Sequence, residues 1–219
     1  MKRVFVETQY EGKLELSGEV IQRLPKRLAL AMPVQFLPFQ EEIKKKLEAM
    51  GKKVLLFKSK HGFHLGQVLG CDIFFFPGEY DAFLYLGDGK FHPTALLYEN
   101  EKEVYCYNPF THKLEVYDQK YLGRVLQQRK GQKAKFLSSE VVGMLVTTKP
   151  GQNHSKEVEK LREKLEKSGK KVFVFLADEI NFSSLENFNF IEVWINTACP
   201  RIIEDFRCLN FLDLKELGF

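Results

Sequence analysis

The expected fold is decided by two stretches that read alike: RLALAMPVQFLPFQEEIKKKLEAMGKKVLLF, residues 27–57, and VVGMLVTTKPGQNHSKEVEKLREKLEKSGKKVFVF, residues 141–175. Each begins with a short apolar run, as expected of a strand covered on both faces. A proline turn follows, and then charged and apolar residues alternate at helical spacing up to a glycine and Lys-Lys-Val. The prolines and the glycines keep the same separation to within one residue, which indicates an internal duplication.

Each half ends in a third apolar run, DAFLYLGDG from Asp81 and IEVWINTACP from Ile191. Strands that alternate with helices are typical of parallel sheets. We therefore predict an α/β protein with two similar small domains, each a parallel-sheet βαβ unit with helices packed on it. Residues 101–119 alternate like a β-hairpin, and residues 119–136 read as a basic, solvated connecting helix. The predicted domains are residues 1–135, including the hairpin and the connecting helix, and residues 136–219.

The composition is that of an ordinary globular protein. The chain has 219 residues, of which 44% are hydrophobic and 28% charged, and this excludes disordered and collagen-like classes. A formal net charge of +4 is too weak to indicate a nucleic-acid or membrane partner. Without a recognisable signal peptide or an apolar run of membrane-spanning length, we expect a cytoplasmic protein with reduced cysteines.

Ligands of parallel α/β sheets bind at the carboxyl ends of the strands. This rule selects, as walls of a candidate site, the turns at residues 32–35, 87–92, 147–152, 178–180 and 196–201. The glycine-rich turn at 87–92 lets a ligand approach the backbone closely. The turn at 148–152 precedes a helix whose N–H groups can hold a carboxylate. The alternative for both is an ordinary turn with nothing bound.

Two of the four cysteines also fall at strand ends. Cys71 lies in the glycine-flanked turn HLGQVLGCD, and Cys199 in NTACPR directly follows a strand. Because the duplication places them on equivalent edges of two domains, we expect both thiolates to be able to reach one metal centre. The alternative is that each is a lone structural cysteine, which is the role we expect of Cys106 and Cys208.

Six short motifs together resemble those of the archaeal and eukaryotic diphthamide synthases, the 2-(3-amino-3-carboxypropyl)histidine synthases. They are GQVLGCD (66–72), YLGDGKFHP (85–93), VYCYNPF (104–110), LVTTKPGQ (145–152), DEI (178–180) and WINTACPRI (194–202). Their order and spacing match from near the start of the chain to near its end. The resemblance is to the archaeal type and covers that family's second and third domains, with no counterpart of the first.

The resemblance implies an iron–sulfur enzyme that cleaves S-adenosylmethionine and adds a 3-amino-3-carboxypropyl radical to a histidine of translation elongation factor 2. Family members have three similar domains, each of which gives one cysteine to a 4Fe-4S cluster. The open iron can then coordinate the cofactor and donate the electron that breaks its S–C bond.

Carried over by position, Cys71 and Cys199 are the expected cluster ligands. The expected cofactor-binding residues are Gln35, Gly87, Asp88, Gly89, His92, Thr148, Gly151, Gln152 and Asp178. No residue is assigned a catalytic role. The chain departs from the family at Cys106, where a basic residue is usual, and at Asn108, where aspartate is usual.

We therefore expect part of a diphthamide synthase, completed by a partner chain that carries the first domain and the third cysteine. Elongation factor 2 is the expected protein substrate, and a homo- or hetero-oligomer is expected. One alternative is a non-catalytic accessory or scaffold protein that binds a synthase subunit or elongation factor 2. A second is a small-molecule-binding α/β protein without a cluster.

Overall fold

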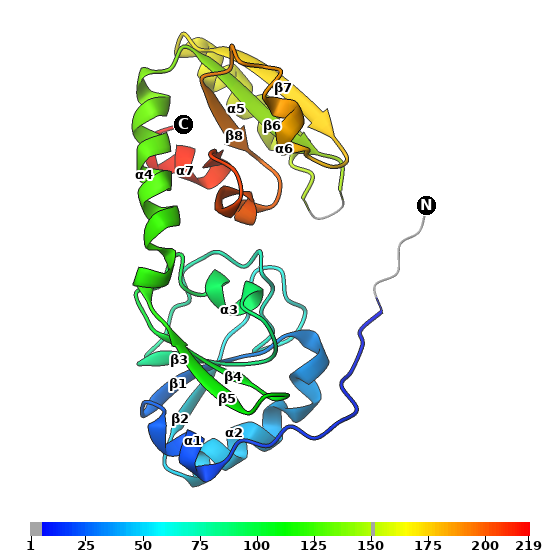
Figure 1. Cartoon of the computed structure of the whole chain (residues 1–219), viewed down its shortest axis with the longest axis vertical. Coiled ribbons are helices and arrows are strands. Elements are labelled where there is room, and N and C mark those ends of the chain that lie inside the picture. Colours follow the sequence, from blue (N-terminus) through cyan, green and yellow to red (C-terminus); the bar gives the residue numbers. More distant parts are fainter. Residues whose placement is uncertain (1–5, 150–151) are drawn as a thin grey trace. The chain divides into compact units, whose positions relative to one another are not determined.

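The computed structural model describes residues 6–149 and 152–219, which form an α/β fold with two compact units (Figure 1). The first unit ends at Leu122, and the second runs from Gly123 to Phe219. Parallel strands alternate with helices in both units, which confirms the predicted fold class. Within the described residues no helix is both long and apolar enough to cross a membrane.

The first unit is built on a five-stranded sheet in the order β2-β1-β3-β4-β5. Its strands are β1 (Arg27–Ala31), β2 (Lys53–Leu56), β3 (Ala82–Leu86), β4 (Val104–Asn108) and β5 (Lys113–Tyr117). All neighbours are parallel except β4 and β5, which form the predicted hairpin. The helical segments are α1 (Gly18–Arg23), η1 (Val34–Phe39), α2 (Gln40–Ala49), α3 (Phe91–Ala95) and η2 (Gln119–Leu122).

The second unit is built on a four-stranded parallel sheet in the order β7-β6-β8-β9. Its strands are β6 (Val141–Thr147), β7 (Lys171–Ala177), β8 (Val193–Asn196) and β9 (Leu209–Asn210). The helical segments are α4 (Gly123–Ser138), α5 (Ser155–Lys167), α6 (Phe182–Leu185), η3 (Pro200–Glu204) and α7 (Phe211–Glu216). In Figure 1, α5 lies behind β6 and β7, whereas α6 lies in front of them.

The duplication is visible in the hydrogen bonds as well as in the strand order. Lys52 and Lys170, each the first lysine after a helix-ending glycine, occupy corresponding places. The ammonium of Lys52 donates to the carbonyl of Leu24, and that of Lys170 donates to the carbonyls of Phe136 and Ser139 at 2.9 and 2.6 Å. The repeated lysine therefore holds the segment that leads into the first strand of each unit.

Each unit packs helices and strands around a core. In the first unit the core joins α1 and α2 to one face of the sheet, with Ile43 and Leu47 of α2 buried. In the second unit the predicted helical positions Val158, Leu161 and Leu165 of α5 are buried against the sheet. Burying a large aliphatic side chain contributes about 1.5–3 kcal/mol, so these faces hold the helices on their sheets.

Helix α4 groups with the second unit, whereas the sequence placed the domain boundary after residue 135. It is also less solvated than its charge suggested. Phe136 is fully buried, and Arg129 and Lys133 pair with Asp213, whose side chain is 0% exposed. A buried carboxylate needs compensating cations, and α4 supplies them to helix α7. The observed boundary therefore lies at Leu122 and Gly123.

Candidate functional site

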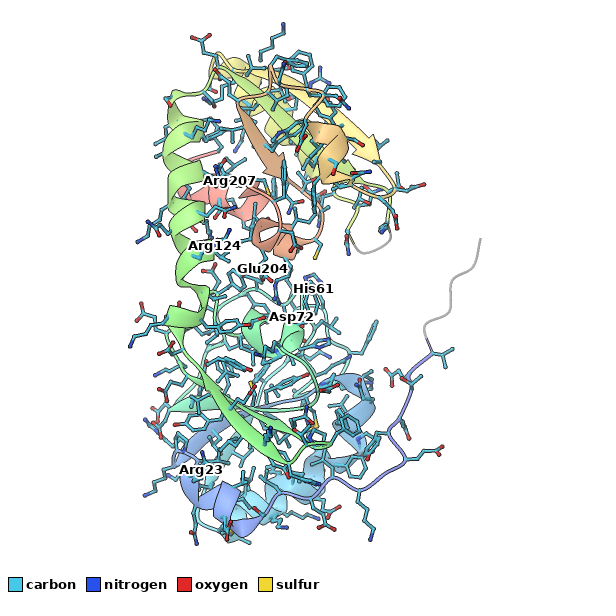
Figure 2. The ribbon with its side chains drawn as sticks, in the orientation of Figure 1. Arg23, His61, Asp72, Arg124, Glu204 and Arg207 are labelled. Carbon is cyan, nitrogen blue, oxygen red and sulfur yellow. The ribbon has the colours of Figure 1, made fainter. Side chains whose placement is uncertain are left out.

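Cys71 lies in a loop near the carboxyl end of β1. The loop is tied to that end because Met32 and Gln67 form a parallel bridge. Asp72, whose side chain is fully buried, accepts hydrogen bonds from the backbone N–H groups of His61 at 3.0 Å and Leu69 at 2.8 Å. Figure 2 shows His61 and Asp72 together. A buried carboxylate with two backbone donors thus fixes the turn that carries the half-buried Cys71.

The turn at Gly87–Lys90 lies beside the β4–β5 hairpin and lines a cavity of about 290 Å³. Gly89 has a φ of +69°, the left-handed region that favours glycine, and a Cβ there would meet nothing within 4 Å. Asp88 Oδ1 accepts from the backbone N–H of Gly89 at 2.8 Å and from the side-chain amide of Asn108 at 2.7 Å. Asn108, which stands where aspartate is usual in the family that the motifs resemble, therefore orients Asp88.

Cys199 begins the turn that follows β8, and its carbonyl is held by a buried asparagine. Asn196 is 1% exposed and donates to the carbonyl of Cys199 at 2.8 Å. Its amide also donates to Asn210 Oδ1 at 2.7 Å, and Asn210 donates to the carbonyl of Pro200 at 2.8 Å. Two buried amides from β8 and β9 therefore shape the turn of the half-buried Cys199.

The second unit brings Cys199 together with two of the expected cofactor-binding residues. A cavity of about 340 Å³ is lined by Cys199, Gln152 and Asp178, together with Thr147, Lys149, Glu179, Ile180, Phe182, Ala198 and Ile202. Thr148 is exposed and donates its hydroxyl hydrogen bond to Asp178 Oδ1, but it is not among the residues that line this cavity. The carboxyl ends of β6, β7 and β8 thus converge on one hollow with a sulfur, an amide and carboxylates.

The remaining expected site residues take other places. Gln35 is half-buried in η1, where its carbonyl accepts from the N–H of Tyr10 at 3.0 Å, and it does not line either cavity. His92 is half-buried in α3, with its ring stacked on Tyr85 at 6.5 Å between centroids. Gly151 lies outside the residues that the structure describes.

Cys106 and Cys208 are buried, as the sequence predicted. Cys106 is 8% exposed and Cys208 is 1% exposed. Burial raises the pKa of both thiols, that of Cys208 to about 12, because a thiolate is poorly solvated in the core. Both thiols are therefore harder to ionise than that of an exposed cysteine. Within the described parts of the chain, no group of three or more histidine, cysteine, aspartate or glutamate side chains is placed to hold a metal ion.

Sequence reasoning missed the buried polar side chains that support the two cysteine turns. Asp72 directly follows Cys71, and Asn196 lies three residues before Cys199. A polar residue adjoining an apolar run is the available signal, because such a residue is buried only with hydrogen-bond partners. Asn210 gives no comparable signal, since its role depends on the pairing of β9 with β8.

Known proteins resemble this chain both in sequence and in fold. Residues 1–207 match the family described as putative diphthamide synthesis protein. The 2-(3-amino-3-carboxypropyl)histidine synthase of Pyrococcus horikoshii is 28% identical over 198 residues, which cover 90% of this chain and 56% of that protein. Subunit 1 of the synthase of Caenorhabditis elegans is 31% identical over 189 residues, covering 83% of this chain and 46% of that protein.

Two solved structures of Dph2 from Pyrococcus horikoshii share the fold. One has a TM-score of 0.76 at 26% identity and covers 90% of this chain and 58% of that chain. The other, which contains a 4Fe-4S cluster, has a TM-score of 0.74 at the same identity and coverage. This chain spans about half the length of the relatives it matches. The match over residues 1–207 shows that the chain belongs to the diphthamide synthesis protein family.

Proposed function

We propose that this chain is part of a 2-(3-amino-3-carboxypropyl)histidine synthase and that Cys71 and Cys199 are two ligands of its 4Fe-4S cluster. The observation that carries the proposal is the cavity that Cys199 shares with Gln152 and Asp178, because these residues come from three family motifs. Family membership, and the cluster in a Dph2 of similar fold, support the same chemistry.

The donor set fits an iron–sulfur cluster in part. Thiolates are the usual ligands of such clusters, and each of these two cysteines lies half-buried on a turn with buried polar supports. Cys208 is 1% exposed, and Cys106, which lines the cavity beside the Gly87–Lys90 turn, is 8% exposed and has a pKa raised by burial. We therefore assign the third thiolate to another domain, which we place on a partner chain.

S-adenosylmethionine is the cofactor that we assign to the carboxyl-end cavities. When bound, the cluster supplies the electron that cleaves the cofactor's S–C bond. The chain's own groups serve binding: the Gly87–Gly89 turn allows close approach of the backbone, and the carboxylates of Asp88 and Asp178 accept hydrogen bonds from an ammonium group. The substrate that we assign is a histidine of translation elongation factor 2.

The test is an anaerobic purification of the chain co-expressed with the partner that copurifies from its native cells. Iron, acid-labile sulfide and transfer of labelled 3-amino-3-carboxypropyl groups to elongation factor 2 are measured. We expect the Cys71→Ala and Cys199→Ala variants to lose both cluster and transfer. The matched control, Cys208→Ala, should keep both when each value is normalised to the folded fraction of the protein.

Two outcomes would count against this assignment. Equal iron content in the Cys71→Ala or Cys199→Ala variant and the parent complex would remove that cysteine from the ligand set. If this chain binds a complete synthase and never itself gains iron, the result would favour the accessory or scaffold role.

A further inference from the structure

A groove along helix α4 lies within the second unit. It has a volume of about 300 Å³ and is lined by residues of α4 and by Arg207, which lies between η3 and β9 (Figure 2). The residues of the helix are Arg124, Gln127, Gln128, Gly131 and Gln132. This α4 groove shares no lining residue with the cavity of Cys199, so it is a separate feature of the unit.

The two guanidinium groups of the α4 groove are left without an acidic partner. Arg124 and Arg207 are exposed, and neither side chain forms an ion pair or a hydrogen bond with a residue that the structure describes. The other arginines of the second unit, Arg129, Arg162 and Arg201, each form an ion pair. The arginines of this unit that keep an uncompensated charge among the described residues therefore meet at one groove.

The other side chains of the α4 groove are neutral amides. Those of Gln127, Gln128 and Gln132 make no hydrogen bond to any residue in the described part of the chain, so their N–H and C=O groups are available to a ligand. None of the described lining residues is acidic or aromatic. A ligand in the groove thus meets two permanent positive charges and several neutral donors, without an opposing carboxylate in the lining.

Gly131 leaves the floor of the groove open. It lies in the middle of the sixteen-residue α4, where glycine is less favourable than alanine by about 1 kcal/mol. Its φ is not positive, and a Cβ there would meet nothing within 4 Å, so neither backbone conformation nor close packing requires a glycine. The bare backbone instead gives a ligand room to lie against the helix.

We propose that the α4 groove binds a small polyphosphate, a ligand with at least two linked phosphoryl groups, between Arg124 and Arg207. A guanidinium group binds phosphoryl oxygens through two parallel hydrogen bonds, and two guanidinium groups on separate segments match a ligand with two anionic groups. A terminal phosphoryl group has three acceptor oxygens, so it can also accept hydrogen bonds from the glutamine amides.

The size and the lining of the groove favour a small inorganic group over a nucleic acid. A volume of about 300 Å³ is at the lower end of the range for small-molecule sites. Proteins that bind single-stranded nucleic acids usually stack the bases on aromatic side chains, and the described lining has none. The proposal uses none of the cysteines and needs no cluster, so its failure is distinguishable from failure of the proposed function.

The first test is calorimetric titration of the full chain with inorganic triphosphate, at constant ionic strength and in a buffer free of phosphate. We expect saturable binding of one triphosphate per chain, and binding of inorganic phosphate that is weaker by tenfold or more. Arg124→Gln and Arg207→Gln should each weaken triphosphate binding by roughly tenfold, because each removes charged hydrogen bonds. The matched control is Lys130→Gln, which removes an exposed cation of α4 outside the groove and should leave the affinity unchanged.

The second test fills the floor of the groove. Gly131→Glu places a carboxylate where the ligand lies and should abolish binding. Ala134→Glu adds the same charge at an exposed position of α4 that does not line the groove, and it should keep most of the affinity. Glutamate favours a helix more than glycine does, so Gly131→Glu should fold normally by circular dichroism.

Several outcomes would overturn the proposal. One is a parent chain that shows no saturable binding of triphosphate, and another is equal affinity in the parent, Arg124→Gln and Arg207→Gln. Equal losses in Gly131→Glu and Ala134→Glu would show an effect of net charge and not of a site. A single-stranded oligonucleotide that binds more tightly than triphosphate, and is weakened by the same arginine variants, would assign the groove to nucleic acid and reject the small ligand.

Discussion

Single buried polar side chains determine how each cysteine is presented. Asp72 uses its carboxylate to hold two backbone N–H groups of the Cys71 loop, and Asn196 uses its amide to hold the carbonyl of Cys199. The two supports differ in chemistry although the units are duplicated. At both places the backbone is fixed before any ligand binds, and such preorganisation lowers the cost of binding.

We predict that Asp72→Asn destabilises the first unit by about 1–3 kcal/mol, because the new NH₂ group faces an N–H donor that it cannot satisfy. The free energy of unfolding in urea and the rate of proteolysis within residues 60–72 measure the effect. Glu101→Gln, which changes an exposed carboxylate, serves as the control. An unchanged unfolding midpoint for Asp72→Asn would contradict the role given to this carboxylate.

Thiol reactivity should separate the cysteines into two pairs. Cys71 and Cys199 are half-buried on turns, whereas burial raises the pKa of Cys106 and Cys208. With iodoacetamide near neutral pH, we expect mass spectrometry to show alkylation of the first pair in the native protein and of all four in urea. Equal native labelling of Cys208 would show that its environment opens more readily than its 1% exposure implies.

At the level of elements, the two units repeat the way in which a strand is started. Asp81 and Glu192 each directly precede the third strand of their unit. Asp81 accepts from the backbone N–H of Arg27 at 3.0 Å, and Glu192 accepts from that of Val141 at the same distance. A carboxylate thus caps the start of the first strand in both units, and the repeated lysine holds the segment that precedes this strand.

This cap should make the second unit sensitive to acid. Hydrogen bonds from the N–H groups of Val141 and Glu140 hold the pKa of Glu192 below its usual 4.5. Because the folded pKa is lowered, the charged cap stabilises the fold above pH 4.5 and loses this effect as the pH falls through the folded pKa. Both bonds reach one oxygen, so Glu192→Gln can keep them without titrating.

Urea unfolding midpoints of the parent chain and Glu192→Gln should therefore converge as the pH falls from neutral to about 3. Glu186→Gln, at an exposed glutamate outside the cap, should run parallel to the parent at every pH. If the difference in urea unfolding midpoint between the parent chain and Glu192→Gln stays constant with pH, titration of Glu192 does not affect the stability of the fold.

For the whole molecule, the boundary between the units determines which fragment of the chain can fold on its own. Residues 123–219 include Arg129 and Lys133, which neutralise the buried Asp213, and residues 136–219 do not. We predict that the longer fragment folds and that the shorter one is destabilised by about 3–5 kcal/mol, since it leaves a buried charge unpaired. Circular dichroism and urea unfolding of the two fragments decide this. Equal stability would return the boundary to residue 135.

Much of the fold follows from the sequence because periodicity and turn residues are local signals. The apolar runs, Gly51 and Gly169 predict the β1-α2-β2 and β6-α5-β7 units, and both glycines have the positive φ expected after a helix. The boundary does not follow, because the cations of α4 look solvated until Asp213 is known to be buried beside them.

The candidate site, like the fold, is only partly predictable from local sequence signals. Cys199, Gln152 and Asp178, selected from strand-end turns, line one cavity because the carboxyl ends of parallel strands meet at one edge. The same rule selects Gln35, but the chain continues there into the 3-10 helix η1, and Gln35 lines neither of the two cavities described above. The α4 groove does not follow from local patterns either, because Arg207 comes to α4 from a distant part of the chain.

The amide pair that shapes the Cys199 turn also bears on the order in which the protein matures. Asn210 lies beyond the residues matched by the family, and it also begins the capping box of α7. During synthesis the chain emerges from its amino end, so Cys199 leaves the ribosome before the residue that fixes its turn. The first unit can close around Cys71 while translation continues. The turn of Cys199 is finished only after Asn210 has emerged, and any metal bound through it is a late acquisition.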